Sequence, residues 1–181
     1  DEVALDLVYK VTKQTAKDLG AAYKPSKVDP LIEKMVVELG RIGKKAGKGF
    51  YDWPSDPRDK KALWPGLGSL VKRLPESQQP DVDELKKRFL YRQALEAARC
   101  YEENVVTDPA DADIGAILGW GFAPYTGGPL SLIDTVGAKS FVAECDRMAQ
   151  LYGERFKPND LLRKMAASGG TFYGKAAKSA A

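Results

Sequence analysis

The sequence contains no histidine and only two cysteines, Cys100 and Cys145. The lack of histidine excludes Ser-His-Asp and Cys-His nucleophilic catalysis, and histidine-based metal sites, within this chain. Both cysteines fall on helical apolar stripes, which favours buried free thiols in a reducing compartment over a disulfide. We therefore predict no catalytic residue and no metal site in this sequence.

Long apolar runs are also absent. No stretch is long enough to cross a bilayer, and no signal peptide is recognised. The formal net charge of +3 over 181 residues is too small by itself to indicate nucleic acid as a partner. A content of 44% hydrophobic and 29% charged residues is that of a globular protein with a sizeable core. The expectation is a soluble, cytoplasmic protein without a transmembrane segment.

The most informative feature of the sequence is the glycine-rich segment 40–53. It holds four glycines and three lysines and ends in aromatic residues. Its spacing matches no phosphate loop, because a Walker loop counted from Gly43 would need glycine where Lys48 stands. Nor does any Gly-x-Gly-x-x-Gly pattern occur.

Two interpretations of this segment remain open. Lys44, Lys45 and Lys48 could contact an anionic partner. Alternatively, the glycines could serve a tight turn in a solvated loop, with Arg41 capping the carbonyl end of the preceding helix.

Apolar periodicity predicts an all-α chain without a strand of useful length. A first helix is expected to end at Gly20, and a second to run from Pro30 to about Leu39. Asp81, with Glu84 three residues later, indicates the start of the longest helix, which should reach about Asn104. Shorter helices are expected after Asp108, ending at Gly119, and over residues 129–136, 138–152 and about 159–167.

An internal repeat organises the chain. Its matching pairs are Asp1-x-Val3 with Asp134-x-Val136, Leu31-x-x-x-Met35 with Leu161-x-x-x-Met165, and Phe50-Tyr51 with Phe172-Tyr173. The second copy is complete from Asp81 onward, whereas the first copy lacks the counterparts of the long helix, of the helix after it and of the Gly-Pro turn. We therefore expect the second half of a first helical domain at residues 1–53, a linker with one or two short helices at 54–80, a complete second domain at 81–174 and a disordered tail at 175–181.

Two segments resemble a known family. Residues 40–51 resemble the Gly-Arg-Lys-x-Gly-Lys-Gly-Phe-Tyr signature that ends the C-terminal helical domain of 3-hydroxyacyl-CoA dehydrogenases. Residues 119–130, Gly-Trp-Gly-Phe-Ala-Pro-Tyr-Thr-Gly-Gly-Pro-Leu, are similar to a segment of the bacterial fatty-acid β-oxidation multifunctional α subunits. The resemblance implies one and a half tandem copies of that helical domain.

The resemblance also implies a function. In this family a His-Glu pair and NAD, both held by a preceding Rossmann domain, oxidise a 3-hydroxyacyl-CoA, so this chain would be inactive alone and bind no cofactor itself. Lys44, Lys45 and Lys48 would contact CoA phosphates, and Trp120, Phe122 and Tyr125 would line an acyl channel or a domain interface. Implied partners are the NAD-binding domain of the same chain and the acyl-CoA substrate. A thiolase subunit and a preceding hydratase domain are left open.

Two other classes of function compete with this one. The first is a non-catalytic helical module for protein interaction on the same scaffold. The second is a nucleic-acid binder that uses the basic and aromatic residues of segment 41–61, although three aspartates dilute that patch. A Rossmann fingerprint and an active-site histidine upstream of Asp1 would decide for the enzyme.

Overall fold

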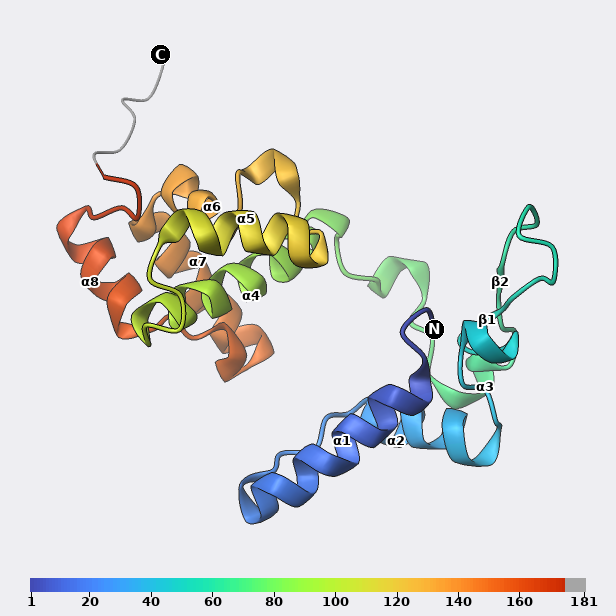
Figure 1. The fold of residues 1–181 in the computed structure, drawn as a ribbon. Helices are drawn as coiled ribbons and strands as arrows, with labels where there is room; N and C mark the ends of the chain where they lie inside the picture. Colours follow the sequence, from blue (N-terminus) through green and yellow to red (C-terminus); the bar gives the residue numbers. More distant parts are fainter. Residues whose placement is uncertain (175–181) are drawn as a thin grey trace. The chain divides into compact units, whose positions relative to one another are not determined.

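The computed structural model describes residues 1–174, and the predicted disorder of 175–181 lies outside them. The chain divides into two compact units, unit 1 from Asp1 to Gln78 and unit 2 from Gln79 onward. Both are built mainly from helices, which confirms the all-α prediction (Figure 1). No helix of the described residues is long and apolar enough to cross a membrane.

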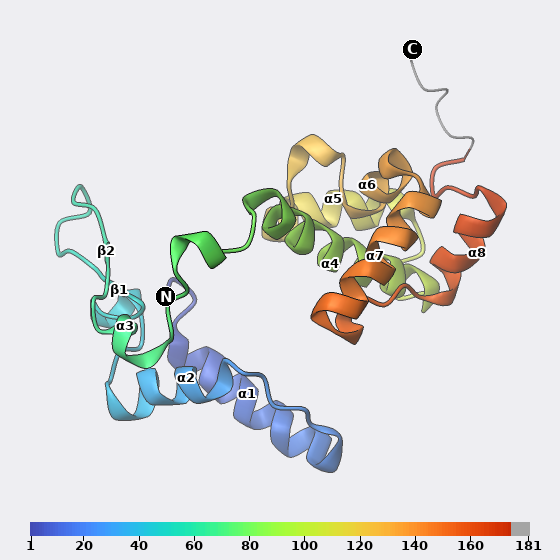
Figure 2. The same cartoon turned by 180° about the vertical axis from the view of Figure 1, so that it is seen from behind.

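Unit 1 is built on two neighbouring helices. Helix α1 (Leu5–Leu19) packs beside α2 (Asp29–Glu33), which continues as a single π-helical turn over Lys34–Glu38 (Figures 1 and 2). Pro30 lies in the first turn of α2, where its missing N–H costs no hydrogen bond. The core of this unit is small, and its buried members are Leu5, Ile32 and Met35.

Residues 54–78 differ from the expected linker. Strands β1 (Tyr51–Asp52) and β2 (Ala62–Leu63) pair antiparallel, and α3 (Leu67–Leu70) follows them. Trp64, Leu67 and Leu70 then pack against the core of unit 1. The short helix expected in this stretch is present as α3, and the core contacts were not expected, because single apolar residues between prolines show no periodicity that reveals them.

Up to residue 174, unit 2 contains five α-helices, which are α4 (Val82–Glu102), α5 (Pro109–Trp120), α6 (Pro129–Val136), α7 (Ala138–Tyr152) and α8 (Asp160–Ser168). Carboxylate or amide oxygens of Asp81, Asp108 and Asn159 cap α4, α5 and α8 by accepting backbone N–H groups. The ring of Tyr91 stacks on Phe141 with centroids 4.5 Å apart and joins α4 to α7. Helix α5 continues past the expected stop at Gly119 to Trp120.

Each unit contains its own copy of the same internal contact, which we call the carboxylate clamp. In unit 1 the carboxylate of Asp1 accepts hydrogen bonds from the backbone N–H groups of Phe50 and Tyr51, at 2.8 and 2.9 Å. In unit 2 the carboxylate of Asp134 accepts the N–H groups of Phe172 and Tyr173, at 3.0 and 3.1 Å. These are pairs that the sequence repeat aligned, so residues that match in the sequence also make equivalent hydrogen bonds in the structure.

The copies also share the backbone geometry of the residue before their fifteen-residue helix. Gly137 has φ 85° and ψ 127°, and Ala4, its counterpart, has φ 79° and ψ 127°. This region is open to glycine and strained for alanine. Unit 1 therefore carries a side chain at a position shaped for glycine.

Candidate functional site

Internal contacts hold the glycine-rich segment 40–53 in place. The guanidinium of Arg41, a side chain that is 10% exposed, donates from Nε to the carbonyl oxygen of Gly49 at 2.7 Å and pairs with Asp52. It also stacks over Trp64, with Cζ 4.2 Å from the ring centroid. The predicted cap on the preceding helix is wrong for this side chain, because it binds carbonyls of its own loop instead.

Two glycines of the segment are explained by their proximity to Asp1. A Cβ at Gly43 would collide with the Asp1 carbonyl oxygen, and a Cβ at Gly49 would collide with its carboxylate. Gly43 also has φ 109°, which L side chains rarely adopt. These glycines therefore serve the carboxylate clamp of unit 1.

The three lysines of the segment have different surroundings. Lys45 Nζ lies 2.7 Å from Asp6 Oδ1, and this bond lowers the pKa of the Asp6 carboxyl below its usual value. Lys44 Nζ lies over the indole of Trp53, 5.2 Å from the ring centroid. Lys48 is exposed, and its ammonium makes no hydrogen bond, ion pair or ring contact with a side chain of residues 1–174. Of these three lysines, Lys44 and Lys48 have no carboxylate partner among residues 1–174, whereas Lys45 is paired with Asp6.

A cavity of about 570 Å³ opens beside Trp53. Its wall includes Lys44 and also Lys61, whose Nζ lies 4.4 Å from the indole centroid of Trp53. Lys61 belongs to the basic and aromatic segment 41–61, but it was not among the lysines expected to contact CoA phosphates. The β1–β2 ladder brings it to the cavity, and that ladder has only two residues in each strand.

The aromatic residues at the end of α5 and in the turn after it fall into two groups by exposure. Phe122 is 2% exposed and belongs to the buried core, so it is not available to a channel or an interface. Trp120 and Tyr125 are 66% and 83% exposed. Trp120 donates from Nε1 to Gln93 at 3.1 Å and borders a cavity of about 330 Å³ lined by residues of α4, α5 and the connection between them.

Unit 2 also holds a buried carboxylate that the sequence analysis did not select. Asp113, 2% exposed, accepts hydrogen bonds from the backbone N–H groups of Leu130 and Ser131, from the Ser131 hydroxyl and from the Tyr173 hydroxyl. Burial raises the pKa of the Tyr173 hydroxyl, and its hydrogen bond to Asp113 raises that pKa further. Four donors on one carboxylate stabilise the start of α6 and leave no oxygen free to act as a base.

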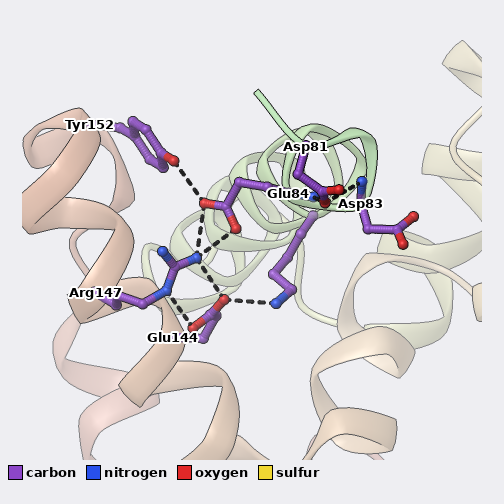
Figure 3. Close-up of polar contacts among 7 residues, drawn as sticks. Asp81, Asp83, Glu84, Glu144, Arg147 and Tyr152 are labelled. Atoms are coloured by element: carbon purple, nitrogen blue, oxygen red, sulfur yellow. Dashed lines mark hydrogen bonds and ion pairs between the residues drawn. The ribbon is translucent and has the colours of Figure 1, made fainter. Parts of the chain in front are cut away.

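Two further carboxylates lie between α4 and α7 in an ionic cluster (Figure 3). Arg147 bonds Glu84 at 2.7 Å and Glu144 at 2.8 Å, while Lys87 bonds Glu144 and Tyr152 bonds Glu84. The Arg147 guanidinium, with help from Lys87, lowers the pKa of Glu144 to about 2. The same guanidinium and the Tyr152 hydroxyl lower the pKa of Glu84. Both carboxylates are ionised and paired at neutral pH, so the cluster fastens two helices.

No group of three or more Cys, Asp or Glu side chains within residues 1–174 is arranged to hold a metal ion. The described residues thus offer engaged carboxylates, a basic and aromatic cavity in unit 1 and an exposed aromatic surface in unit 2. These features suit binding and positioning better than proton transfer.

Known proteins match the chain along nearly its whole length. Residues 1–53 match the family described as 3-hydroxyacyl-CoA dehydrogenase, C-terminal domain. The chain is 37% identical over 174 residues to the fatty acid oxidation complex subunit alpha of Shewanella amazonensis, covering 96% of this chain and 24% of that protein. The namesake from Vibrio vulnificus is 37% identical over 173 residues, 96% of this chain and 23% of its own length.

The chain spans about a quarter of the length of the curated relatives it matches. The match includes both copies of the repeat, since it covers 96% of this chain. The resemblance seen in the sequence is confirmed: residues 1–53 match the family of 3-hydroxyacyl-CoA dehydrogenase C-terminal domains, and the chain as a whole is similar to about a quarter of the fatty acid oxidation complex α subunits.

Proposed function

We propose that this chain is the C-terminal part of an NAD-dependent 3-hydroxyacyl-CoA dehydrogenase, within a fatty acid oxidation complex α subunit. The observation that carries the proposal is the 37% identity over 96% of the chain, across both repeat copies. The activity would belong to the complete protein, in which this part supplies substrate-side and interface surfaces. Its setting would be the cytoplasm, and a thiolase subunit would be a candidate partner.

The chemistry divides between this chain and the rest of the protein. The reaction moves a hydride from C3 of the 3-hydroxyacyl-CoA to NAD and removes the hydroxyl proton, which needs a base. The described residues form no parallel sheet with a glycine-rich turn that would fit the dinucleotide. Since the carboxylates of Asp113, Glu84 and Glu144 are all engaged by donors, we assign both the base and the NAD site to the remaining part of the α subunit.

The lysines of the glycine-rich segment are the proposed contacts to CoA phosphates. Lys44 and Lys48 are exposed and have no carboxylate partner in residues 1–174. Lys45 would have to leave Asp6 to join them, so we expect it to contribute less. In unit 2, the exposed rings of Trp120 and Tyr125 are the proposed interface residues, and Phe122 holds the turn that presents them.

Assays of the isolated chain and of the complete α subunit test this function. The complete protein should oxidise 3-hydroxyacyl-CoA with NAD, whereas residues 1–181 alone should show no turnover above a contaminant control. Turnover by the isolated chain would contradict the division of chemistry. Absence of activity in the complete protein would favour the alternative of a non-catalytic helical interaction module.

The lysine contacts have their own test in the complete protein. Replacing Lys44, Lys45 and Lys48 together by alanine should raise KM several-fold, since a partly solvated charge contact is worth about 1 kcal/mol. The effect should shrink as salt is added, and kcat should change little. An unchanged KM at low salt would contradict the phosphate contact.

A further inference from the structure

Trp53 is a fixed platform at the cavity of unit 1. Its indole Nε1 donates to Asp1 Oδ2 at 2.9 Å, and its backbone N–H donates to the carbonyl oxygen of Gly47 at 2.9 Å. Because the ring is bonded at its edge and its backbone is tied to the loop, ring contact with a ligand would cost little additional ordering. The carboxylate clamp thus also orients an aromatic surface.

Two ammonium groups lie at this platform with little to neutralise them. Lys44 and Lys61 approach the Trp53 ring centroid to 5.2 and 4.4 Å. Lys44 has no carboxylate partner in residues 1–174, and Lys61 reaches only Glu2, at 3.4 Å between two exposed groups. Such an exposed pair contributes little and can open at little cost. Asp59 is the one acidic residue of the lining within the described chain, so the cavity carries an excess of positive charge.

The dimensions and the remaining wall fit a small ligand with a flat part. A volume of about 570 Å³ lies in the range of small-molecule sites. Pro54 and Pro57 add apolar surface beside the indole, and Ser55 adds a hydroxyl. Lysine ammonium groups bind phosphate as point charges, and indole rings stack on nucleobases without sequence preference.

From these features we propose that the cavity formed around Lys44, Trp53 and Lys61 binds a nucleoside phosphate. The base lies against the indole, and the phosphate lies at the two ammonium groups. This adds Trp53 and Lys61 to the lysine contacts described above. The identity of the natural ligand, the phosphorylated adenosine of CoA, rests on the proposed function; binding of a nucleoside phosphate does not.

Titration of the chain with adenosine 3′,5′-bisphosphate tests the site directly. Calorimetry measures the binding, and the NMR signal of the Trp53 Nε1 proton reports whether the ligand lies at the indole. Binding should saturate and shift that signal. Lys44→Ala and Lys61→Ala should each weaken binding about fivefold, the scale of an exposed charge contact. Lys60→Ala is the matched control, because Lys60 is an exposed neighbour of the same charge that does not line the cavity, and it should bind as the wild type does.

Adenosine and inorganic phosphate alone should each bind at least about tenfold more weakly than the bisphosphate, since each offers one half of the recognition. The site is refuted if the bisphosphate does not saturate at millimolar concentration, if Lys60→Ala weakens binding as much as Lys61→Ala, or if inorganic phosphate binds as tightly as the bisphosphate.

Kinetics of the complete α subunit test whether the natural ligand of the cavity is the nucleotide part of CoA. Lys61→Ala should raise KM for a 3-hydroxyacyl-CoA and leave KM for the matching pantetheine thioester unchanged, because the thioester lacks the nucleotide. An equal effect on both substrates, or none on either, would overturn CoA as the ligand. A complete protein without dehydrogenase activity would refute the proposed function, while bisphosphate binding by the chain would still stand.

Discussion

Ala4 and Gly137 stand at equivalent positions before α1 and α7. Ala4→Gly should stabilise unit 1, and Gly137→Ala should destabilise unit 2. Ala4 has φ 79° and ψ 127°, a region that alanine avoids because its Cβ crowds the following carbonyl oxygen. Holding a non-glycine residue at positive φ costs about 1–2 kcal/mol. Ala4→Gly removes that cost but loses about 0.4–1 kcal/mol, since glycine makes the unfolded chain more flexible. The net expectation is that unit 1 gains about 1 kcal/mol.

Gly137→Ala is the matched reverse change in unit 2. A Cβ at Gly137 meets no atom within 4 Å, so steric overlap does not contribute to its effect. The strain of φ 85° remains, and the same two terms with opposite sign predict a loss of about 1 kcal/mol from unit 2. Each variant should leave the other unit unchanged, because the units have separate cores.

Native-state hydrogen exchange measures both effects at once, since it reports α1 and α7 separately. A change of 1 kcal/mol alters the exchange of the most protected amides about fivefold. Amides of α1 should exchange more slowly in Ala4→Gly, and those of α7 faster in Gly137→Ala. If Ala4→Gly accelerates exchange in α1, or if Gly137→Ala leaves α7 unchanged, the argument from backbone strain is refuted.

Two further perturbations test contacts described above. In Arg41→Lys the new side chain cannot reproduce the donors to Gly49 and Asp52, so urea unfolding should show unit 1 destabilised by about 2 kcal/mol. Arg58→Lys is the control, because the Arg58 side chain is 89% exposed, and its effect should be nearly neutral. The pKa of Glu144, held near 2 by Arg147 and Lys87, predicts a contribution to unit 2 that is complete above about pH 4.5 and is lost as pH falls toward 2. Glu144→Gln should flatten that part of the stability curve, and a carboxyl titrating in NMR near 4.5 would contradict the ionic cluster.

Local signals in the sequence located most of unit 2. Asp81 was predicted to cap α4, and its carboxylate does accept the N–H groups of Asp83 and Glu84. The long apolar stripes of α4 and α7 likewise became core. These features depend on residues within a few positions of one another, and sequence patterns record them.

The rest depended on contacts between distant residues. Glu84 was part of the start signal of α4, yet its carboxylate binds Arg147, 63 residues away. The glycines of the loop were noted without their reason, which is the approach of Asp1. Lys61 was grouped with Lys44 only as part of the basic segment 41–61, and the ladder that brings the two to one cavity could not be predicted, because two residue pairs leave no periodic trace. For the candidate site, the kinds of residue could be read from the sequence, but which side chains contact one another could be seen only in the structure.

The carboxylate clamp has a consequence for how the two copies can diverge. Asp1 and Phe50 are 49 residues apart in the chain, whereas Asp134 and Phe172 are 38 apart, and both pairs make the same hydrogen bond. Lengthening a closed loop from 38 to 49 residues adds only about 0.2 kcal/mol of closure entropy. Since the clamp fixes the two ends, a loop between them that does not contribute to the core can gain or lose residues with little change in closure entropy. A duplicated half-domain of this kind can acquire a new loop, with its lysines and its cavity, in one copy while the other keeps the short form.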